Sequence, residues 1–359
     1  MTEDEKYMKI ALDLAKFGCG FTSPNPCVGA VIVKNRRIVG VGYHKKKGEK
    51  HAEVRAIEDA GEYVKGSTMY VTLEPHSFYG TQPPCTEAII RAGIKRVVIA
   101  TLDPNPNVNG KGVEILKKAG VEVEVGILRE EAEFINRFFI HYMKTGRPYV
   151  ILKLAQTLDG FIADSRGNSR WISGEESRKE VHRIRGEVDA IMIGRGTLVK
   201  DDPELLPREV FAPRRPVRII VSGNGNIDFK RKIFGTEGKK IIAVGKGHKL
   251  DVPPAIQKDV EVIEVERKNE GINLEYLMEE LGKKGIQSVL CEGGGKLAGS
   301  LLMENLVNEL LIFYAPFMLG DGKKAFEGFS SLLRERQDRF TLYSSTKLGN
   351  DIMVRYLRK

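Results

Sequence analysis

The chain has 359 residues, which is long for one ordinary domain and suggests two. Its composition, 42% hydrophobic and 29% charged, is that of a globular protein, and no apolar run approaches the roughly 20 residues that span a membrane. The N-terminus lacks the basic and then apolar order of a signal peptide. Four cysteines without framework spacing predict a reducing cytoplasm: Cys19, Cys27, Cys85 and Cys291.

The net charge of +9 raises the question of nucleic acid. Most basic residues are interleaved with acidic ones, and the short runs at 45–47 and 230–232 are typical of solvated loops. A mildly basic enzyme that handles phosphorylated small molecules is at least as consistent with this charge as a nucleic-acid binder.

The first 145 residues alternate helical and strand patterns, which predicts a layered α/β domain. We expect helices at 5–17, 51–60, 84–92, 110–119 and 129–143, and strands at 28–33, 37–43, 68–73, 96–101 and 121–125. Gly146 and Pro148 follow the last helix and predict a linker, so we divide the chain into domains 1–145 and 146–359.

The second half begins again with a strand pattern. We expect strands at 149–155, 190–193, 217–221, 240–244, 260–265 and 288–291, and helices at 175–185, 274–283 and 296–304. There is no low-complexity segment and no internal repeat. This half is therefore predicted to be a second α/β domain.

A motif for metal chemistry lies in the first half. His51-Ala52-Glu53 opens a predicted helix, and Pro83-Pro84-Cys85 opens another, close to the H-x-E and P-C-x-x-C zinc signature of nucleobase deaminases. Such a site needs three protein ligands and an open position for water, whose pKa the zinc lowers. His51, His76 and Cys85 are the predicted ligands, and Glu53 is the predicted proton carrier.

The alternative is that the two histidines are ordinary surface residues and that Cys85 is a small buried hydrophobe. The order of these residues, with the glutamate and the prolines in place, favours the metal site. Because Cys85 is expected in a first helical turn, we also expect backbone N–H groups and the helix dipole to stabilise its thiolate.

At this point the chain resembles the bifunctional deaminase/reductase family of riboflavin biosynthesis. The resemblance is carried by Thr22-Ser23-Pro24-Asn25-Pro26, by 28–31, by His51-Ala52-Glu53, by 70–75, by Pro83-Pro84-Cys85 and by Asp103-Pro104-Asn105-Pro106. It implies a cytidine-deaminase-like α/β/α domain in which Asn25 and His44 contact the pyrimidine end of the substrate.

The departures from the family pattern lie in one loop. The pattern there is roughly P-C-S-H-x-G-(K/R)-T-P-P-C, whereas this chain has His76 for the cysteine, Phe78 for the histidine, Thr81 for the basic residue and Gln82 for the threonine. One interpretation is an active site with two histidines and one cysteine on zinc. The other is a decayed deaminase domain kept as a scaffold, which leaves a reductase only.

In the second half, Cys291-Glu292-Gly293-Gly294-Gly295-Lys296 joins a predicted strand to a predicted helix. Glycines there let a phosphate approach a helix N-terminus, but the signal is weak alone, and no G-x-G-x-x-G occurs. The resemblance covers this half too, through 152–155, 157–160, 171–173, 188–197 and 201–203, and it implies a dihydrofolate-reductase-like α/β domain that uses NADPH.

The resemblance implies the following roles. NADPH would lie near Ala155, Trp171, Ser173, Thr197, Asp201, Gly294, Gly295, Lys296, Leu297, Ala298, Gly299 and Ser300. The ribosyl phosphate would meet Ser169, Arg185, Leu205, Arg208 and Glu292. Reduction of a ribosylamine needs its open form, to which the cofactor delivers hydride. Lys153 would lie near the carbon that receives this hydride and, with Asp201, would assist proton movement.

Three of these residues also have an ordinary structural interpretation. Lys153 would be a surface cation beside a strand, Arg185 would lie on a solvated helix face, and Trp171, the one tryptophan, would be a core anchor. Taken together, the sequence predicts a zinc-dependent deaminase joined to an NADPH-dependent reductase. We expect a homodimer that acts on a small pyrimidine ribosyl phosphate, without nucleic acid or membrane.

Overall fold

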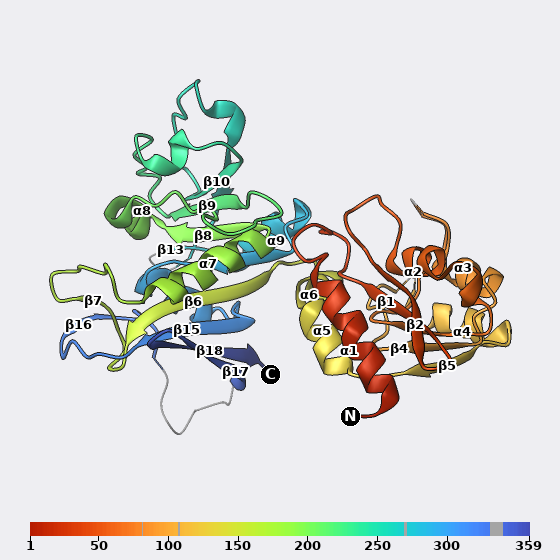
Figure 1. The fold of residues 1–359 in the computed structure, drawn as a ribbon. Coiled ribbons are helices and arrows are strands. Elements are labelled where there is room, and N and C mark those ends of the chain that lie inside the picture. The colour runs from red at the N-terminus through yellow and green to blue at the C-terminus, as the bar shows by residue number, and fades with distance from the viewer. Residues whose placement is uncertain (81, 107, 269–270, 331–339) are drawn as a thin grey trace. The chain divides into compact units, whose positions relative to one another are not determined.

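The structure is a computed structural model that describes residues 1–80, 82–106, 108–268, 271–330 and 340–359. The chain forms two compact units, Met1–Gly146 and Arg147–Lys359, so the division lies one residue from the expected boundary (Figure 1). Thr81, one of the departures in the ligand loop, lies outside the described residues.

The first unit is a five-stranded sheet between two layers of helices. Its strands are β1 (Gly29–Lys34), β2 (Arg37–Tyr43), β3 (Thr68–Val71), β4 (Arg96–Ile99) and β5 (Glu122–Val125), in the order β2-β1-β3-β4-β5. Its helices are α1 (Glu3–Lys16), α2 (Ala52–Ala60), α3 (Cys85–Arg91), α4 (Lys111–Lys118), α5 (Arg129–Ile135) and α6 (Arg137–Thr145), with a 3₁₀ turn η1 (Gly61–Val64). β1 is antiparallel to both neighbours, and β3, β4 and β5 are parallel.

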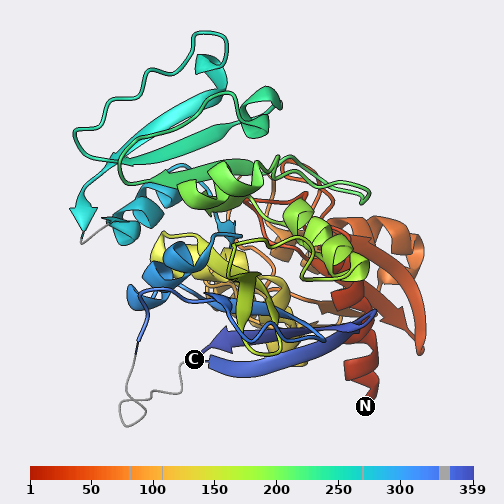
Figure 2. The ribbon, with the colours of Figure 1, turned by 90° about the vertical axis from the view of Figure 1, so that its left-hand side faces the viewer.

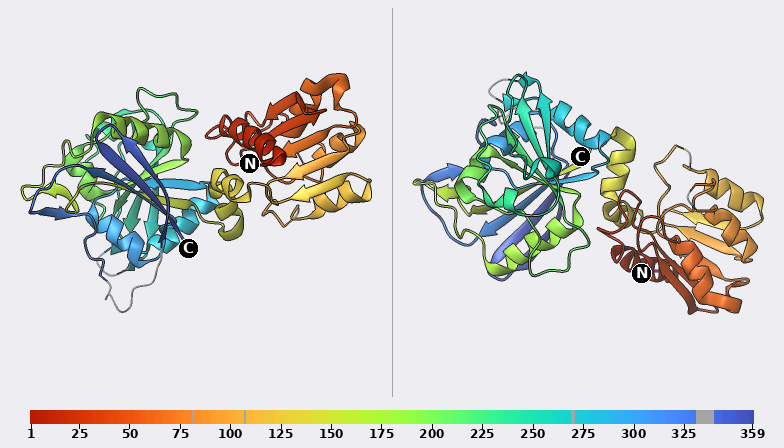
Figure 3. Two further views of the ribbon diagram at one scale, coloured as in Figure 1. Left: turned by 60° about the horizontal axis from the view of Figure 1, so that its bottom comes forward. Right: turned by 90° about the horizontal axis from the view of Figure 1, so that it is seen from above.

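Two apolar clusters hold these layers together. On one face of the sheet, Ala56 of α2, Ile89 of α3 and Leu116 of α4 pack against the strands. On the other face, Met8 and Leu12 of α1 do so. Figure 3 shows α1 on the opposite side of this sheet from α2. The α/β/α arrangement predicted for this half is confirmed.

Close packing of α2 on the sheet sets the position of the metal motif. A Cβ atom at Gly42 of β2 would overlap the carbonyl oxygen of Ala52, the first residue of α2. Only glycine allows the start of this helix to approach the strand so closely. His51, immediately before α2, is thereby held at the edge of the sheet.

The helix expected at 129–143 is interrupted. α5 ends at Ile135 and α6 begins at Arg137, with Asn136 between them. The buried Asn136 side chain accepts a hydrogen bond from the Cys27 backbone N–H (2.8 Å) and donates one to the Cys27 carbonyl oxygen (2.9 Å). The interruption therefore ties the loop that carries Asn25 to the helical layer.

The second unit is built on a nine-stranded sheet, in the order β11-β10-β9-β8-β14-β6-β15-β18-β17. Its strands are β6 (Tyr149–Thr157), β8 (Ala190–Gly194), β9 (Val217–Ser222), β10 (Lys240–Gly245), β11 (Val260–Val265), β14 (Ser288–Cys291), β15 (Glu309–Ala315), β17 (Phe340–Leu348) and β18 (Asp351–Arg358). All neighbours from β11 to β15 are parallel, and β18 and β17 are antiparallel additions at one edge, drawn in dark blue in Figure 2.

The remaining elements connect and cover this sheet. They are α7 (Glu175–Glu187), α8 (Arg195–Asp201), α9 (Leu274–Lys283), α10 (Gly295–Met303), the 3₁₀ turns η2 (Lys232–Gly235) and η3 (Gln257–Asp259), and two small pairs, β7 (Phe161–Asp164) with β16 (Gly322–Lys324) and β12 (Arg267–Lys268) with β13 (Gly271–Ile272). Leu277 of α9 and Leu301 of α10 pack with Leu152 of β6 in the main core. Among the described helices, none is long and apolar enough to cross a membrane.

Candidate deaminase and reductase sites

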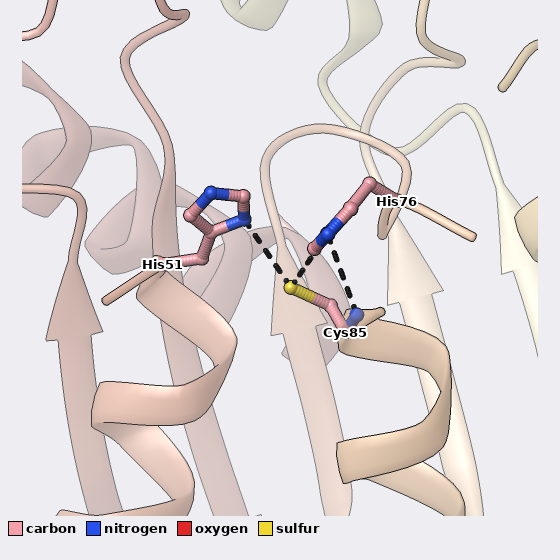
Figure 4. A group of neighbouring side chains, drawn as sticks. All are labelled: His51, His76 and Cys85. Atoms are coloured by element: carbon pink, nitrogen blue, oxygen red, sulfur yellow. Dashed lines mark hydrogen bonds between the residues drawn. The ribbon is translucent and has the colours of Figure 1, made fainter. Parts of the chain in front are cut away.

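The three predicted metal ligands come together in the first unit. His51 caps the start of α2, Cys85 is the first residue of α3, and His76 lies in the loop after β3. The Cys85 sulfur lies 3.0 Å from His76 Nδ1 and 3.4 Å from His51 Nδ1, as Figure 4 shows. All three ligand atoms lie within 4.8 Å of one another. Two imidazole nitrogens and one sulfur at these separations fit the donor set and geometry of a tetrahedral zinc site.

The surroundings of the histidines keep them neutral, as metal ligands must be. Burial lowers the pKa of His51 to about 4, helped by the nearby His76 and His44. Burial also lowers the pKa of His76, whose ring hydrogen-bonds the backbone carbonyl of Gln82. A ligating histidine with its second nitrogen fixed by a carbonyl is typical of metal sites.

The expected stabilisation of the Cys85 thiolate is wrong for the protein without metal. Cys85 is fully buried, and burial together with the neighbouring Glu53 raises the pKa of its thiol well above the usual value. A backbone hydrogen bond from His76 lowers the pKa of this thiol, as predicted for a backbone contact, but its effect is smaller than that of burial and Glu53. A metal ion must therefore displace a proton from Cys85 when it binds.

Glu53 and the expected pyrimidine contacts line one cavity of about 260 Å³ with the ligand histidines. Glu53 is only 3% exposed, and burial raises the pKa of its carboxyl group, which suits a group that takes up and delivers a proton. His44 Nε2 lies 3.2 Å from Asn25 Nδ2, and His44 Nδ1 lies 3.3 Å from the Lys50 carbonyl oxygen. His44 therefore donates from Nδ1 and accepts from Asn25 at Nε2.

Sequence analysis quoted Asp103 and Asn105 without giving them a role, and both line this cavity. Burial, together with Glu74, raises the pKa of Asp103 to about 6. The Glu74 carboxylate accepts hydrogen bonds from the backbone N–H groups of Asp103, Gly110, Gly112 and Val113 (2.9–3.3 Å) and so shapes the loop. Their position in the sequence could have indicated a role, because both residues follow β4 at the carboxyl edge of the parallel strands, where ligands commonly bind.

The altered loop also contributes to the cavity. Phe78 and Gln82 line it, and the Phe78 ring meets the His76 ring edge-on at 5.8 Å between centroids. Gln82 Nε2 donates to the Gly48 carbonyl oxygen at 3.1 Å. His76, Phe78 and Gln82, the departures that lie in the described residues, therefore all line the cavity.

In the second unit, the predicted residues gather at the carboxyl ends of three adjacent strands. β14 lies between β6 and β8, with Cys291 opposite Leu152 and Met192. The next residues along β6 and β14, Lys153 and Glu292, are thus neighbours. This edge is where ligands bind in open α/β sheets.

An ion pair forms the centre of this group. Arg185 Nε and Nη2 lie 2.6 and 2.9 Å from the two Glu292 carboxylate oxygens, and Arg185 Nη1 donates to the Leu206 carbonyl oxygen at 3.3 Å. The solvated-face interpretation of Arg185 is wrong, because its side chain is 15% exposed. Burial acts to raise the pKa of Glu292, but Arg185 holds it below its usual value.

Lys153 faces this pair. Burial lowers the pKa of its ammonium group, against the opposing effect of Glu292. The surface-cation interpretation is therefore wrong as well. An amine with a lowered pKa beside a fixed carboxylate is a reasonable proton donor in reduction.

His182 of α7 is a neighbour that sequence analysis missed. Its Nδ1 accepts a hydrogen bond from the Arg208 backbone N–H at 3.1 Å, which ties the loop containing Leu205 and Arg208 to the helix. The Leu205 side chain is buried, while Arg208 is exposed and pairs with Glu204 at 2.7 Å. No sequence signal marked His182, because a histidine within a charged helix has no distinguishing pattern.

The expected cofactor residues fall into two groups. Those near the starts of α8 and α10 are close together, since a Cβ atom at Gly294 would lie 3.6 Å from the Thr197 hydroxyl. Asp201 ends α8, and its carbonyl oxygen accepts from Arg170 at 2.7 Å. Ala155 and Ser169 are partly buried.

The loop before α7 holds the other group. Trp171 is 69% exposed, so its interpretation as a core anchor is wrong. The Arg178 guanidinium lies 4.5 Å from the Trp171 ring centroid, and Arg178 Nη1 donates to the Ser173 carbonyl oxygen at 2.7 Å. An exposed indole held by a cation is available to a ligand.

The stretch 294–300 divides by face. Leu297 and Ala298 belong to the core, and Cβ atoms at Gly295 and Gly299 would collide with the backbone of Lys324 and Glu327. Lys296 and Ser300 are exposed. Packing thus requires glycine at positions 295 and 299. The groups of this stretch that remain open to the expected cofactor are the backbone at the helix start and the side chains of Lys296 and Ser300.

Comparisons with known proteins match both halves of the chain. The family model described as the cytidine and deoxycytidylate deaminase zinc-binding region matches residues 1–101, and the RibD C-terminal domain matches residues 148–354. The chain is 43% identical to riboflavin biosynthesis protein RibD of Aquifex aeolicus, with 99% of this chain and 98% of that protein covered. It is 40% identical to RibD of Bacillus amyloliquefaciens, with 99% and 96% covered.

Solved structures are similar over the full length. Acinetobacter baumannii RibD has a TM-score of 0.88 at 37% identity, with 99% of each chain covered. A diaminohydroxyphosphoribosylaminopyrimidine deaminase/5-amino-6-(5-phosphoribosylamino)uracil reductase from Thermotoga maritima has a TM-score of 0.88 at 36% identity, again with 99% of each covered.

Fold and sites together define a zinc-dependent deaminase joined to an NADPH-dependent reductase with a dihydrofolate-reductase-like domain. The chain belongs to the RibD family of riboflavin biosynthesis enzymes.

Proposed function

We propose that the first unit deaminates 2,5-diamino-6-ribosylamino-4(3H)-pyrimidinone 5′-phosphate and that the second unit then reduces the ribosyl chain of the product to ribityl. The observation that carries this proposal is the convergence of His51, His76 and Cys85, whose two histidines line one cavity with the buried Glu53. The Thermotoga maritima relative, whose name gives both activities, supports the choice of substrate.

In the deaminase unit, His51, His76 and Cys85 would hold zinc, which would supply the Lewis acid that makes water nucleophilic near neutral pH. Glu53 takes a proton from the attacking water and delivers it to the departing amino group, so that water and the amine give a carbonyl and ammonia. Its raised pKa suits both transfers. Asn25 and His44, joined by a hydrogen bond, orient the pyrimidine.

In the reductase unit, bound NADPH would supply hydride to the open form of the ribosylamine. Lys153 donates the proton that balances the hydride, and Glu292 holds hydroxyl groups of the sugar chain. Because Glu292 and Leu206 occupy most of the hydrogen-bonding capacity of Arg185, we assign the main phosphate contact to Arg208, with Ser169 and the backbone at Leu205 beside it.

The cofactor is proposed to rest against the starts of α8 and α10 and against Trp171. Thr197 and Gly294 bring the two helix starts together, and Lys296 and Ser300 are exposed there. Ala155, Ser173 and Asp201 complete the proposed contact. Backbone N–H groups at the start of a helix suit the cofactor phosphates.

We further propose a homodimer in a reducing cytoplasm. The outer strand β17 and its neighbour β18 expose Leu342 (57%) and Ile352 (49%) at the edge of the sheet, a surface that a second copy would cover. All four cysteines lie in the described ranges, and none forms a disulfide. Sedimentation of the full chain as a monomer at micromolar concentration would contradict the dimer.

Ammonia release from the diamino substrate, with zinc present and NADPH absent, tests the deaminase assignment. We expect release by the wild type and a loss of about 100-fold or more in Glu53→Gln, because a positioned proton carrier contributes about 10²–10⁴ in rate. Glu53→Gln should still reduce the deaminated substrate. A wild type that reduces that substrate but releases no ammonia would support the alternative of a reductase with a decayed deaminase unit.

A further inference from the structure

The described metal centre contains one sulfur ligand only. Among the described residues, the group of neighbouring histidine, cysteine and acidic side chains consists of His51, His76 and Cys85, and the other cysteines are not part of it. Figure 4 shows both imidazole rings directed at the single Cys85 sulfur. The donor set is therefore two neutral nitrogens and one thiolate.

Several contacts fix the position of the His76 side chain. Its Nδ1 faces the Cys85 sulfur at 3.0 Å and accepts a hydrogen bond from the Cys85 backbone N–H at 3.4 Å. The ring also hydrogen-bonds the Gln82 carbonyl, and Phe78 packs edge-on against it. Because contacts on several sides fix the ring, its nitrogen is aimed at the centre without any rearrangement.

One thiolate and two imidazoles favour a particular class of metal ion. Soft ions such as Cd²⁺ gain most of their binding energy from sulfur, whereas imidazole suits borderline ions such as Zn²⁺ and Co²⁺. A single thiolate also cancels only one charge of a divalent ion, and Cys85 and Glu53 are almost completely buried, where water screens charge weakly. Each thiolate therefore strengthens the binding of any divalent ion, and because sulfur is a soft ligand it strengthens Cd²⁺ binding more than Zn²⁺ binding.

We propose that His76 sets the metal preference of this centre, so that it takes borderline divalent ions and discriminates against soft, sulfur-seeking ones. This inference rests on the ligand set proposed above. It goes further because it assigns His76 a selective role that the deaminase reaction itself does not require.

The test compares the wild type with His76→Cys, which adds a second thiolate at the same position. The full chain, stripped of metal with a chelator, is titrated with Zn²⁺ and with Cd²⁺ in competition with a chromophoric chelator. We expect the ratio of Cd²⁺ affinity to Zn²⁺ affinity to be lower in the wild type than in His76→Cys by on the order of tenfold. Equal ratios in the two proteins would overturn the proposal.

Co²⁺ substitution supplies a second readout that does not depend on activity. The near-ultraviolet charge-transfer absorption from thiolate to Co²⁺ should be about half as strong in the wild type as in His76→Cys and absent in Cys85→Ser, since it follows the number of thiolates. An unchanged band in Cys85→Ser would overturn the ligand set itself, and the preference with it. If His76→Cys does not fold, His76→Ala is used in its place. The visible absorption bands of tetrahedral Co²⁺ should then be lost in His76→Ala, and persistence of these bands would overturn the role of His76.

Discussion

At the scale of single residues, Cys85 determines how metal binding responds to pH. The pKa of the Cys85 thiol is raised by burial and by Glu53, whereas burial lowers the pKa values of His51 and His76. At pH 7 the thiol is therefore protonated and both imidazoles are neutral. The metal must displace one proton, and its affinity should fall as the pH falls.

We predict that binding of one Zn²⁺ at pH 7 releases one proton. Calorimetric titration in two buffers with different ionisation enthalpies measures this number. His76→Cys should release two protons, since it carries two thiols, and Cys85→Ser should release none. Zinc binding to the wild type without proton release would contradict the assignment of a protonated Cys85.

The Arg185–Glu292 pair is the second feature at this scale. Both side chains are largely buried, 15% and 10% exposed, and the geometry is bidentate. Removal of one partner of a buried pair leaves an uncompensated charge and costs about 3–5 kcal/mol, whereas removal of both costs far less. The pair thus makes a specific prediction for a double-mutant cycle.

We expect Arg185→Met to destabilise the second unit by about 3 kcal/mol and Arg185→Met with Glu292→Met to recover most of that loss. Scanning calorimetry of the full chain measures these changes in stability. The unfolding transition of the second unit is identified as the one that NADPH shifts. The pKa of Glu292 is lowered in the fold, so the contribution is present above the unfolded pKa of about 4.3 and is lost as the pH falls through the folded value. A double variant as unstable as Arg185→Met would contradict this account.

At the scale of elements, packing explains a pattern that resembled a binding motif. Gly295 and Gly299 lie one helical turn apart on α10 and face the backbone of Lys324 and Glu327. A side chain at either position would force these segments apart. The start of α10 is thereby held at the carboxyl end of β14.

We predict that Gly299→Ala destabilises the second unit by about 1–3 kcal/mol, because the added methyl group collides with the Glu327 carbonyl. NADPH affinity should fall with it, as the helix start moves. Met303→Ala, at an exposed position of the same helix that is outside the proposed cofactor contact, is the matched control and should change stability by less than about 0.5 kcal/mol. Normal stability and NADPH affinity in Gly299→Ala would show that the close packing has no role.

Elements with a regular apolar period could be predicted from the sequence. The strands of the first unit and the parallel strands β6, β8, β9, β10, β11 and β14 lie where the patterns indicated. The antiparallel strands β17 and β18 were missed; most side chains of the edge strand β17 are exposed and no alternation marks it. The buried strand β15 was missed as well, although its apolar run was available.

Features that depend on contacts between distant segments could not be predicted. The interruption at Asn136 exists because its side chain binds the backbone of Cys27, 109 residues away in the sequence. The placement of Asp103 in the cavity depends on Glu74, and that of His182 on the loop before Arg208. The convergence of His51, His76 and Cys85 was predictable because metal-site chemistry restricts both the types and the order of the residues.

At the scale of the whole molecule, two chemically different reactions are joined in one chain. The deaminase cavity lies entirely within the first unit, and the Lys153, Arg185 and Glu292 group lies entirely within the second. The family models match the two parts separately, at 1–101 and 148–354. Each activity should therefore fail independently when its own residues are changed.

The most direct test of this account is the stoichiometry of the full chain acting on the diamino substrate with zinc and NADPH. The account predicts one ammonia released for each NADPH oxidised, and loss of both in Glu53→Gln, which still oxidises NADPH with the deaminated substrate. Oxidation of NADPH by the wild type on the diamino substrate without release of ammonia would contradict it, because reduction would then proceed without a working His51–His76–Cys85 centre.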